Sequence, residues 1–305
     1  MIKKITIASR ESLLAMWQAK HIKTQLNLLY PDLTIQIKGF KTQGDIILDK
    51  SLATIGGKGL FIKELEQALL NKDADLAVHS MKDLPMNIME DFQLAAITKR
   101  EDPRDAFISE LYNSLDDLPA GSVVGTSSLR RQSQIKAKYP HLEIRPLRGN
   151  LQTRLNKLKK GDYAAIILAA AGLIRLGLKE KITMFLETNI SIPAVGQGAL
   201  GIEMLSGNEE LHTLIKPLND ENSARCVLAE RMVSRSLAGS CNVPLGAYAF
   251  IEKESLIING FVATPDGNHF IHAETKGDKA QFYSLGESLS QLLIDQGAKE
   301  LLSEL

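Results

Sequence analysis

The spacing of apolar residues in the first half of the chain alternates between the two-residue period of a strand and the 3.6-residue period of a helix. Ile5 and Ile7 share one face of an expected strand, and an apolar stripe with steps of three and four residues then runs from Ala15 to Leu29. This alternation continues and predicts α/β layers with largely parallel sheets. The expected strands cover residues 2–8, 34–40, 75–79, 122–126, 142–145 and 163–169, and the further expected helices cover residues 60–71, 128–138 and 150–160.

Two crossings divide this region into two units. Residues 99–104 form a charged stretch that contains Pro103, and residues 192–198 form a second stretch with one proline and two glycines. If the chain passes from one unit to the other at both stretches, the second unit is inserted in the first and the two stretches form the hinge. Residues 198–204 are then expected to return to the first unit as a strand. We therefore expect a discontinuous first domain, residues 1–98 and 199–219, and a second domain, residues 104–193.

The last third of the chain shows a different order of elements. Strands are expected after a first helix, and a final helical segment follows them. The expected ranges are a helix at 222–238, strands at 245–252, 255–263 and 268–275 with a turn at 264–267, and helix at 278–303. Strands grouped together and then a helix predict a small α+β domain, residues 221–305.

The overall charge conceals a strong local imbalance. The 305 residues carry 36 Lys and Arg against 36 Asp and Glu, so the formal net charge is zero, which argues against a general polyanion binder. Residues 121–180 nevertheless hold twelve basic and three acidic residues, a net charge of +9. Only Tyr139 and Tyr163 could stack on bases in that segment, so we expect no nucleic-acid partner.

The sequence shows no pattern typical of a membrane-spanning helix, a signal peptide or a metal site. The longest uncharged apolar run, residues 163–174, has twelve residues, whereas a spanning helix needs about 20. The first residues lack the apolar stretch of a signal peptide, and two cysteines do not form a disulfide framework, so we expect a cytoplasmic protein. The six histidines show no metal-ligand spacing, so no metal site is expected.

Hydroxyl and cationic side chains follow nearly every expected strand. They occur at residues 9–12, 79–83, 126–131 and 148–150, and at Arg175. Ligands of open α/β sheets bind beyond the carboxyl ends of the strands, where helix N-termini favour anions and arginine forks hold carboxylates at two points. Together these positions predict a small ligand with several carboxylates. The alternative for any single position is a helix cap or a solvated surface arginine.

The sequence leaves two interpretations open for each of two residues, Asp83 and Cys241. Asp83 is an acid in a region otherwise suited to anions; it either binds an N–H group or stabilises a developing cation, or it simply pairs with Lys82 or an arginine. Cys241 lies in a loop after a helix, where a reachable thiol is either a nucleophile or attachment point, or an incidental loop residue. Cys226 has apolar neighbours on the expected helix and is predicted to fill a core.

Seven short motifs, spread over essentially the full chain, resemble those of the hydroxymethylbilane synthase (porphobilinogen deaminase) family. They occur in the family's order, which makes a chance match improbable. The motifs are RESLLAMWQ (10–18), GGKGLF (56–61), HSMKDLP (79–85), GTSSLRRQ (125–132), LRGN (147–150), IPAVGQG (192–198) and GSC (239–241).

The resemblance implies a transferase of tetrapyrrole (porphyrin, haem) biosynthesis. Its fold is expected to be two lobes similar to periplasmic binding proteins, joined by hinges, plus a small α+β C-terminal domain. Such an enzyme condenses four porphobilinogen molecules head to tail, releases ammonia at each step and hydrolyses the product as linear hydroxymethylbilane. It holds a dipyrromethane cofactor through a thioether, for which the GSC motif implies Cys241, and it is expected to be a monomer.

The resemblance also implies roles for individual residues. Asp83 matches the catalytic aspartate, where a carboxylate can hold pyrrole N–H groups, stabilise positive charge and take part in proton transfers. The residues implied to bind the cofactor are Cys241, Ser12, Lys82, Thr126, Ser127, Ser128, Arg130, Arg131, Arg148, Gly149, Asn150, Ala169 and Gln197. The residues implied to bind or cover the substrate are Arg10, Lys58, Phe61, Arg148, Arg154 and Arg175.

The segment 41–59 is expected to be a long mobile loop. Its GGKG stretch lacks the spacing of a phosphate-binding loop and favours a flexible lid that carries Lys58. Gln43 and Thr54 stand where many relatives carry basic residues, so this lid is expected to hold carboxylates less tightly. The alternative function is a hinged, non-catalytic binding protein for a small polycarboxylate; the third domain with Cys241 argues against it.

Overall fold

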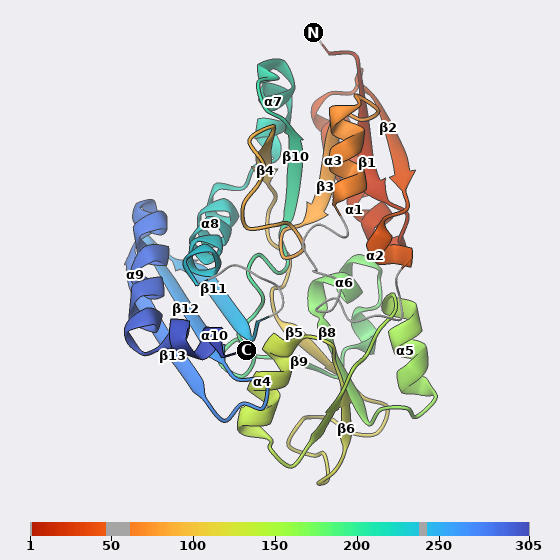
Figure 1. Cartoon of the computed structure of the whole chain (residues 1–305). Coiled ribbons are helices and arrows are strands. Elements are labelled where there is room, and N and C mark those ends of the chain that lie inside the picture. Colours follow the sequence, from red (N-terminus) through yellow and green to blue (C-terminus); the bar gives the residue numbers. More distant parts are fainter. Residues whose placement is uncertain (1, 47–61, 238–242, 305) are drawn as a thin grey trace. The chain divides into compact units, whose positions relative to one another are not determined.

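The computed structural model describes residues 2–46, 62–237 and 243–304 (Figure 1). The chain divides into two compact units, Met1–Arg100 with Ala199–Ala224, and Glu101–Gly198 with Arg225–Leu305. The first unit contains one five-stranded sheet, and the second contains a five-stranded and a three-stranded sheet. The predicted class, two α/β parts and a small C-terminal α+β part, is confirmed. The finer division into three domains stays a prediction.

The sheet of the first unit has the strand order β2-β1-β3-β10-β4. β1 pairs in parallel with β2 and β3, whereas β10 pairs antiparallel with β3 and β4. The expectation of largely parallel sheets is therefore only half right, because the return strand β10 enters in the opposite direction. The elements are β1 (Lys4–Arg10), α1 (Leu13–Leu29), β2 (Thr34–Phe40), α2 (Gln43–Ile46), α3 (Lys63–Leu70), β3 (Leu76–Ser80), β4 (Phe92–Ile97), β10 (Leu200–Leu205) and α7 (Glu209–Ile215).

Helices pack on both faces of this sheet because its strands alternate apolar residues between the faces. Ile7, Val78 and Ile202 belong to a core cluster with the α1 stripe, which ends at Leu26. Ala77 belongs to a second cluster with Leu65 and Leu69 of α3. The predicted stripe reached one turn too far, since Leu29 at the end of α1 is exposed.

The five-stranded sheet of the second unit has the order β7-β6-β8-β5-β9 and repeats the mixed pattern. β6 is parallel to β7 and β8, and β5 is antiparallel to β8 and β9. The apolar run that predicted a buried strand becomes β8, whose residues 165–168 are buried on both faces. The elements are β5 (Asp105–Ile108), β6 (Val123–Gly125), α4 (Leu129–Lys138), β7 (Glu143–Arg145), α5 (Leu151–Lys159), β8 (Ala165–Ala169), α6 (Ala170–Arg175) and β9 (Met184–Leu186).

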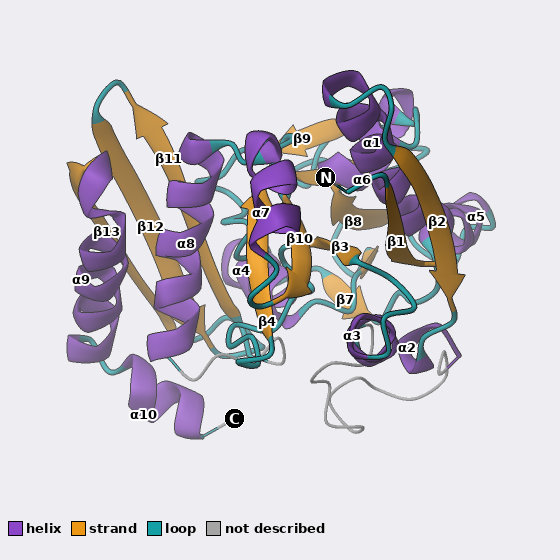
Figure 2. Ribbon diagram, turned by 90° about the horizontal axis from the view of Figure 1, so that it is seen from above, coloured by secondary structure: helices purple, strands orange, loops and turns teal. Residues whose placement is uncertain are grey.

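The three-stranded sheet is antiparallel in the order β11-β12-β13, and α9 packs on β12 and β13 (Figure 2). The predicted final helix is two helices, because Gly297 adopts a φ of +94° between them. Cys226 is buried on α8, as predicted. None of the helices in the described ranges is long and apolar enough to cross a bilayer. The elements are α8 (Glu221–Ser236), β11 (Leu245–Glu252), β12 (Ser255–Ala263), β13 (Phe270–Asp278), α9 (Phe282–Asp295) and α10 (Ala298–Ser303).

The turn between β12 and β13 rests directly on the backbone of α4. The side-chain amide of Gln132 donates to the Pro265 carbonyl at 3.2 Å. Gly267 has a φ of +76°, and a Cβ atom there would lie 2.5 Å from the nitrogen of Ala137 and 2.6 Å from the carbonyl oxygen of Ser133. Only glycine fits both the conformation and the space, so this turn supports the helix that begins with Arg130 and Arg131.

We expect Gly267→Ala to destabilise the protein more than Gly121→Ala. Both glycines have nearly the same positive φ, but a Cβ atom on Gly121 would have nothing within 4 Å. Gly121→Ala should therefore lose only about 1 kcal/mol for the left-handed backbone, whereas Gly267→Ala should lose about 1–3 kcal/mol more because atoms overlap. Urea unfolding of both variants measures the difference. Equal losses of unfolding free energy in the two variants would show that the turn can move away from α4 and does not support it.

Candidate functional site

The loop before α4 uses its own hydroxyl groups to hold its shape. It follows β6, and Ser128 is the N-cap residue of α4 although its side chain makes no capping bond. The Thr126 hydroxyl accepts a hydrogen bond from the Ser128 backbone nitrogen at 3.2 Å. The Ser127 hydroxyl donates to the Leu147 carbonyl at 3.0 Å. Neither Thr126 nor Ser127 is the N-cap of α4, so the capping interpretation is wrong for both; their hydroxyl groups bind the backbone of the loop and of residue 147 instead.

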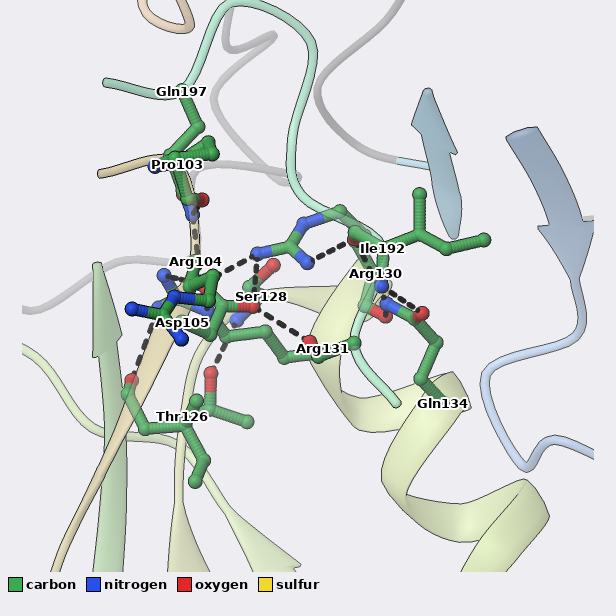
Figure 3. Close-up of polar contacts among 12 residues, drawn as sticks. Pro103, Arg104, Asp105, Thr126, Ser128, Arg130, Arg131, Gln134, Ile192 and Gln197 are labelled. Carbon is green, nitrogen blue, oxygen red and sulfur yellow. Dashed lines mark hydrogen bonds and ion pairs between the residues drawn. The ribbon is translucent and has the colours of Figure 1, made fainter. Parts of the chain in front are cut away.

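Arg130 and Arg131, the first basic residues after the loop, converge on one buried carboxylate, Asp105 (Figure 3). Nη2 of Arg130 lies 2.8 Å from Oδ2, and Nη2 of Arg131 lies 2.7 Å from Oδ1. Ser191 and Gln197 donate to the same carboxylate at 2.7 and 3.0 Å. Asp105 is fully buried, and the two arginines are 5% and 7% exposed. We call these five residues the Asp105 cluster.

The sequence analysis missed Asp105, although a signal was present. It is the first residue of β5, directly before the buried residues Ala106, Phe107 and Ile108. An acid at the start of an apolar strand has to find cations or donors, since a buried charge without partners is very unfavourable. The adjacent arginines at the start of α4 are the partners that the fold provides.

The electrostatics of the Asp105 cluster leave it with a surplus of positive charge. Burial by itself would raise the pKa of Asp105, but the charges of Arg130 and Arg131 outweigh burial and hold that pKa well below its usual range. Burial lowers the pKa of Arg130, against the attraction of Asp105. Two cations share one anion, and Nε of Arg130 is buried with no hydrogen-bond partner among the described residues. The cluster therefore suits a further anionic group such as a carboxylate.

The turn of residues 148–150 is built around its glycine and its cap. Asn150 caps α5 by accepting a hydrogen bond from the Thr153 nitrogen at 2.9 Å. Nε of Arg154 donates to the Gly149 carbonyl at 2.8 Å. Gly149 has a φ of +109°, and a Cβ atom there would lie 2.7 Å from the Thr153 methyl group. The turn thus fixes the backbone beside the half-buried Arg148.

Ala169 and Arg175 lie at the two ends of α6. Ala169 is the last residue of β8, pairs with Asp105 and serves as the N-cap of α6. Nη2 of Arg175 donates to the Gly198 carbonyl at 2.6 Å, and burial lowers the pKa of Arg175 to about 10. Gln197, beside that carbonyl, also donates to the Pro103 carbonyl at 2.7 Å. The end of the IPAVGQG motif is thus tied to α6 and to the segment that leads into β5.

A small cavity of about 60 Å³ in the first unit brings together several predicted residues. Asp83, in the turn after β3, is exposed, and its nitrogen donates to the Ser80 carbonyl at 2.9 Å. Lys82 beside it is half-buried. Ser12 is the N-cap of α1 and accepts from the Ala15 nitrogen at 3.4 Å. The polar residues that line the cavity are Arg10, Ser12, Gln18, His79, Ser80 and Asp83.

Gln18 and His79 are cavity residues that the sequence analysis did not select. Gln18 lies in the buried stripe of α1, and its amide donates to the Ser80 hydroxyl at 2.9 Å. A polar residue on an otherwise apolar helical face was the available signal. A larger cavity of about 470 Å³ lies in the second unit between α4, residues 188–192 and the β12–β13 strands, but none of the predicted site residues lines it.

Three predicted site residues, Lys58, Phe61 and Cys241, lie outside the described residues, as does most of the predicted lid. Within the described ranges no group of three or more histidine, cysteine, aspartate or glutamate side chains is placed to hold a metal ion. The remaining predicted residues form two sets, one around Asp83 in the first unit and one around the Asp105 cluster, α5 and α6 in the second.

Comparison with known proteins identifies the family. Residues 5–213 match the family model described as "Porphobilinogen deaminase, dipyromethane cofactor binding domain", and residues 224–295 match "Porphobilinogen deaminase, C-terminal domain". Among solved structures, the BvgS periplasmic VFT2 domain of Bordetella pertussis aligns at 14% identity with a TM-score of 0.41, covering 70% of this chain and 86% of that chain.

Curated relatives match along the whole chain. The porphobilinogen deaminase of Laribacter hongkongensis is 57% identical over 301 residues, which is 99% of this chain and 98% of the relative. That of Nitrosomonas europaea is 57% identical over 303 residues, with coverage of 99% and 98%. That of Neisseria meningitidis serogroup B is 55% identical over 300 residues, with coverage of 98% and 96%. With both family models matched in order, the chain belongs to the porphobilinogen deaminase family.

Proposed function

We propose that the chain is a hydroxymethylbilane synthase. It condenses four porphobilinogen molecules head to tail, releases ammonia at each step and hydrolyses the product as linear hydroxymethylbilane. The observation that carries the proposal is the Asp105 cluster, a buried arginine pair with one counter-charge and an unused donor, in a chain of this family. Such a cluster suits a ligand with several carboxylates.

The arginines act by binding and orienting carboxylates. Porphobilinogen carries an acetate and a propionate group, and each addition to the chain brings two more. Arg130 and Arg131 are held rigidly by Asp105, so they supply fixed positive charge for a carboxylate and lose little side-chain entropy when it binds. Arg148, Arg154 and Arg175 are the further proposed substrate-binding arginines of the second unit. Arg10, Lys58 and Phe61 complete the proposed substrate-binding set.

The matched family model is that of the dipyrromethane cofactor-binding domain, and the Asp105 cluster fits such a group. When bound, the dipyrromethane supplies the pyrrole carbon to which the first substrate molecule is added. Cys241 is the proposed attachment point. The residues proposed to hold the cofactor's carboxylates and pyrrole rings are Ser12, Lys82, Thr126, Ser127, Ser128, Arg130, Arg131, Arg148, Gly149, Asn150, Ala169 and Gln197.

Asp83 is the proposed catalytic residue. Loss of ammonia from porphobilinogen leaves positive charge on the pyrrole, and a carboxylate next to the ring N–H stabilises that charge as it develops. The same carboxylate can accept a proton after the new carbon–carbon bond has formed. Its exposed position after β3, with Arg10 and Ser12 lining the same cavity, supports this role.

We place the enzyme in the cytoplasm as a monomer. Attachment of the cofactor through a thioether needs a free thiol at Cys241, and a reducing compartment keeps thiols free. The family resemblance supports the monomer, which sedimentation or size-exclusion chromatography with light scattering measures directly.

The cofactor proposal predicts a covalent adduct on the purified protein. Intact mass spectrometry should find dipyrromethane on the wild-type chain and on Cys226→Ala, but not on Cys241→Ala. Cys226 is the matched control because it is the other cysteine and lies buried on α8. An active wild-type enzyme without an adduct, or an adduct that persists in Cys241→Ala, contradicts the attachment.

Wild-type protein should convert porphobilinogen to a product that cyclises spontaneously to uroporphyrinogen I, and Asp83→Asn should convert it about 10²–10⁴-fold more slowly. The amide keeps the size of the side chain and removes its charge, so the melting temperature should stay the same. Asp91→Asn, at another exposed aspartate of the first unit, serves as the control and should turn over normally. Normal turnover by Asp83→Asn would remove Asp83 from its role.

Arg131→Leu should impair both cofactor loading and stability. The substitution leaves Asp105 with one guanidinium in place of two, and breaking a buried pair loses about 3–5 kcal/mol. Because Arg131 helps to depress the pKa of Asp105, the stabilisation is present above the ordinary aspartate range and is lost as the pH falls toward the folded-state pKa. Urea unfolding at several pH values and intact mass measure the two effects.

Arg145→Leu is the control for this variant. Arg145 pairs with Glu143 on the surface, where both side chains are about half exposed, and such a pair contributes about 0–1 kcal/mol. Its loading and stability should stay close to those of the wild type. If Arg131→Leu behaved in the same way, the carboxylate-binding argument would fail.

A further inference from the structure

A buried histidine–glutamate pair lies between β3 and β10, next to the cavity that contains Asp83. Nε2 of His79 is 3.0 Å from Oε2 of Glu203. His79 is 6% exposed, and Glu203 is fully buried. Nε2 is the ring nitrogen that faces Glu203, and the imidazole and the carboxylate share one hydrogen in this contact.

The pair lies in an apolar layer, on the face of the sheet that α3 covers. His79 pairs with Gly201 and Glu203 pairs with Ala77, so His79 and Glu203 are diagonal neighbours on that face. Ala77 packs there with Leu65 and Leu69. The second oxygen of Glu203 is buried without a hydrogen-bond partner among the described residues. Apolar side chains would fill this place with less desolvation, so stability alone does not account for the pair.

The charge of Glu203 also reaches α3. Burial raises the pKa of Glu66 on α3, the negative charge of Glu203 raises it further, and His79 opposes both. The titratable groups that face His79 are therefore Glu203 from β10 and Glu66 from α3, and Arg10 and Asp83 line the same cavity. The pair thus connects the sheet, the helix that covers it and the cavity.

His79 is also directly connected to the turn that carries Asp83. Ser80, the next residue, is held by the amide of Gln18 through its hydroxyl. The carbonyl of Ser80 accepts the hydrogen bond from the Asp83 nitrogen at 2.9 Å. The nitrogen of Met81 donates to the Ala199 carbonyl just before β10. The direction in which Asp83 projects thus depends on how the end of β3 is fixed against β10.

We propose that Glu203 and His79 are positioning residues for the condensation reaction. Glu203 fixes the imidazole and the end of β3, and this sets the placement of Asp83 and the charge beside it. The inference rests on the proposed function, because it concerns the rate of the same reaction. It assigns no contact with the substrate to Glu203, which acts through His79.

The test compares purified, cofactor-loaded variants of the full chain. Glu203→Gln keeps the shape of the side chain and removes its charge. We expect it to carry the dipyrromethane adduct and to keep KM for porphobilinogen within about twofold, while kcat falls about tenfold or more. We also expect the pH dependence of kcat to change, because the substitution alters the charge next to the cavity that contains Asp83. His79→Gln should have the same effects, and the double variant should lose little more than either single variant.

Met204→Leu is the packing control, since Met204 is fully buried on β10 with its side chain in the cluster on the opposite face. It should keep kcat, KM and the pH profile. A lower melting temperature of Glu203→Gln and His79→Gln with unchanged kcat and pH profile would make the pair purely structural and overturn the proposal. A wild-type protein that does not convert porphobilinogen would instead overturn the proposed function, before any variant is measured.

Discussion

The charge of one buried aspartate determines where two arginines of the second unit can be. Asp105 enters a fully buried strand, and it is stable there only because Arg130, Arg131, Ser191 and Gln197 all donate to it. The start of α4, the IPAVGQG segment and β5 are joined at this carboxylate. Any arrangement of these segments that separated the arginines from Asp105 would leave charges buried without partners, which is the least favourable state available to them. The Asp105 cluster therefore stabilises this arrangement of the three segments and also disfavours other arrangements.

The Asp105 cluster shows how part of the local charge imbalance is compensated in a chain with zero net charge. Residues 121–180 carry a net charge of +9, and the rest of the chain carries the compensating −9. In the structure one of those compensating acids, Asp105, is placed against two of the basic residues, so part of the imbalance is neutralised by direct contact. The neutralisation is incomplete, since two guanidinium groups share a single carboxylate. The formal charge of the Asp105 cluster therefore stays positive.

Local sequence signals predicted the elements well where the periodic pattern covered many residues. β2, β12 and the helix α1 are examples, because their periodicity covers many residues. The strands β4, β5 and β9, with six, four and three residues, were missed. Length alone does not explain this, since β6 and β7 have three residues each and were predicted. The antiparallel entry of β10 and β5 was also missed, since direction is set by partners distant in sequence.

The residues of the candidate site likewise divide into those that local sequence signals identified and those that depend on distant partners. Motifs identified Asp83 and the arginines, because their residue types follow strand ends in the sequence. They did not identify Asp105, Gln18 or Glu203, whose importance comes from partners 25, 62 and 124 residues away. Nor could a motif tell that Thr126 and Ser127 use their hydroxyl groups on nearby backbone. Burial and pairing across the sheet decide these cases, and neither is written in a short stretch of sequence.

The contact of Gly267 with α4 also orders events during synthesis of the protein. α4 is complete at Lys138, but the turn that supports its backbone is made about 130 residues later. During translation, the helix that carries Arg130 and Arg131 therefore lacks the contact with this turn until most of the chain has emerged from the ribosome. A chain that ended before residue 264 would keep both arginines and lose the contacts between the turn and α4.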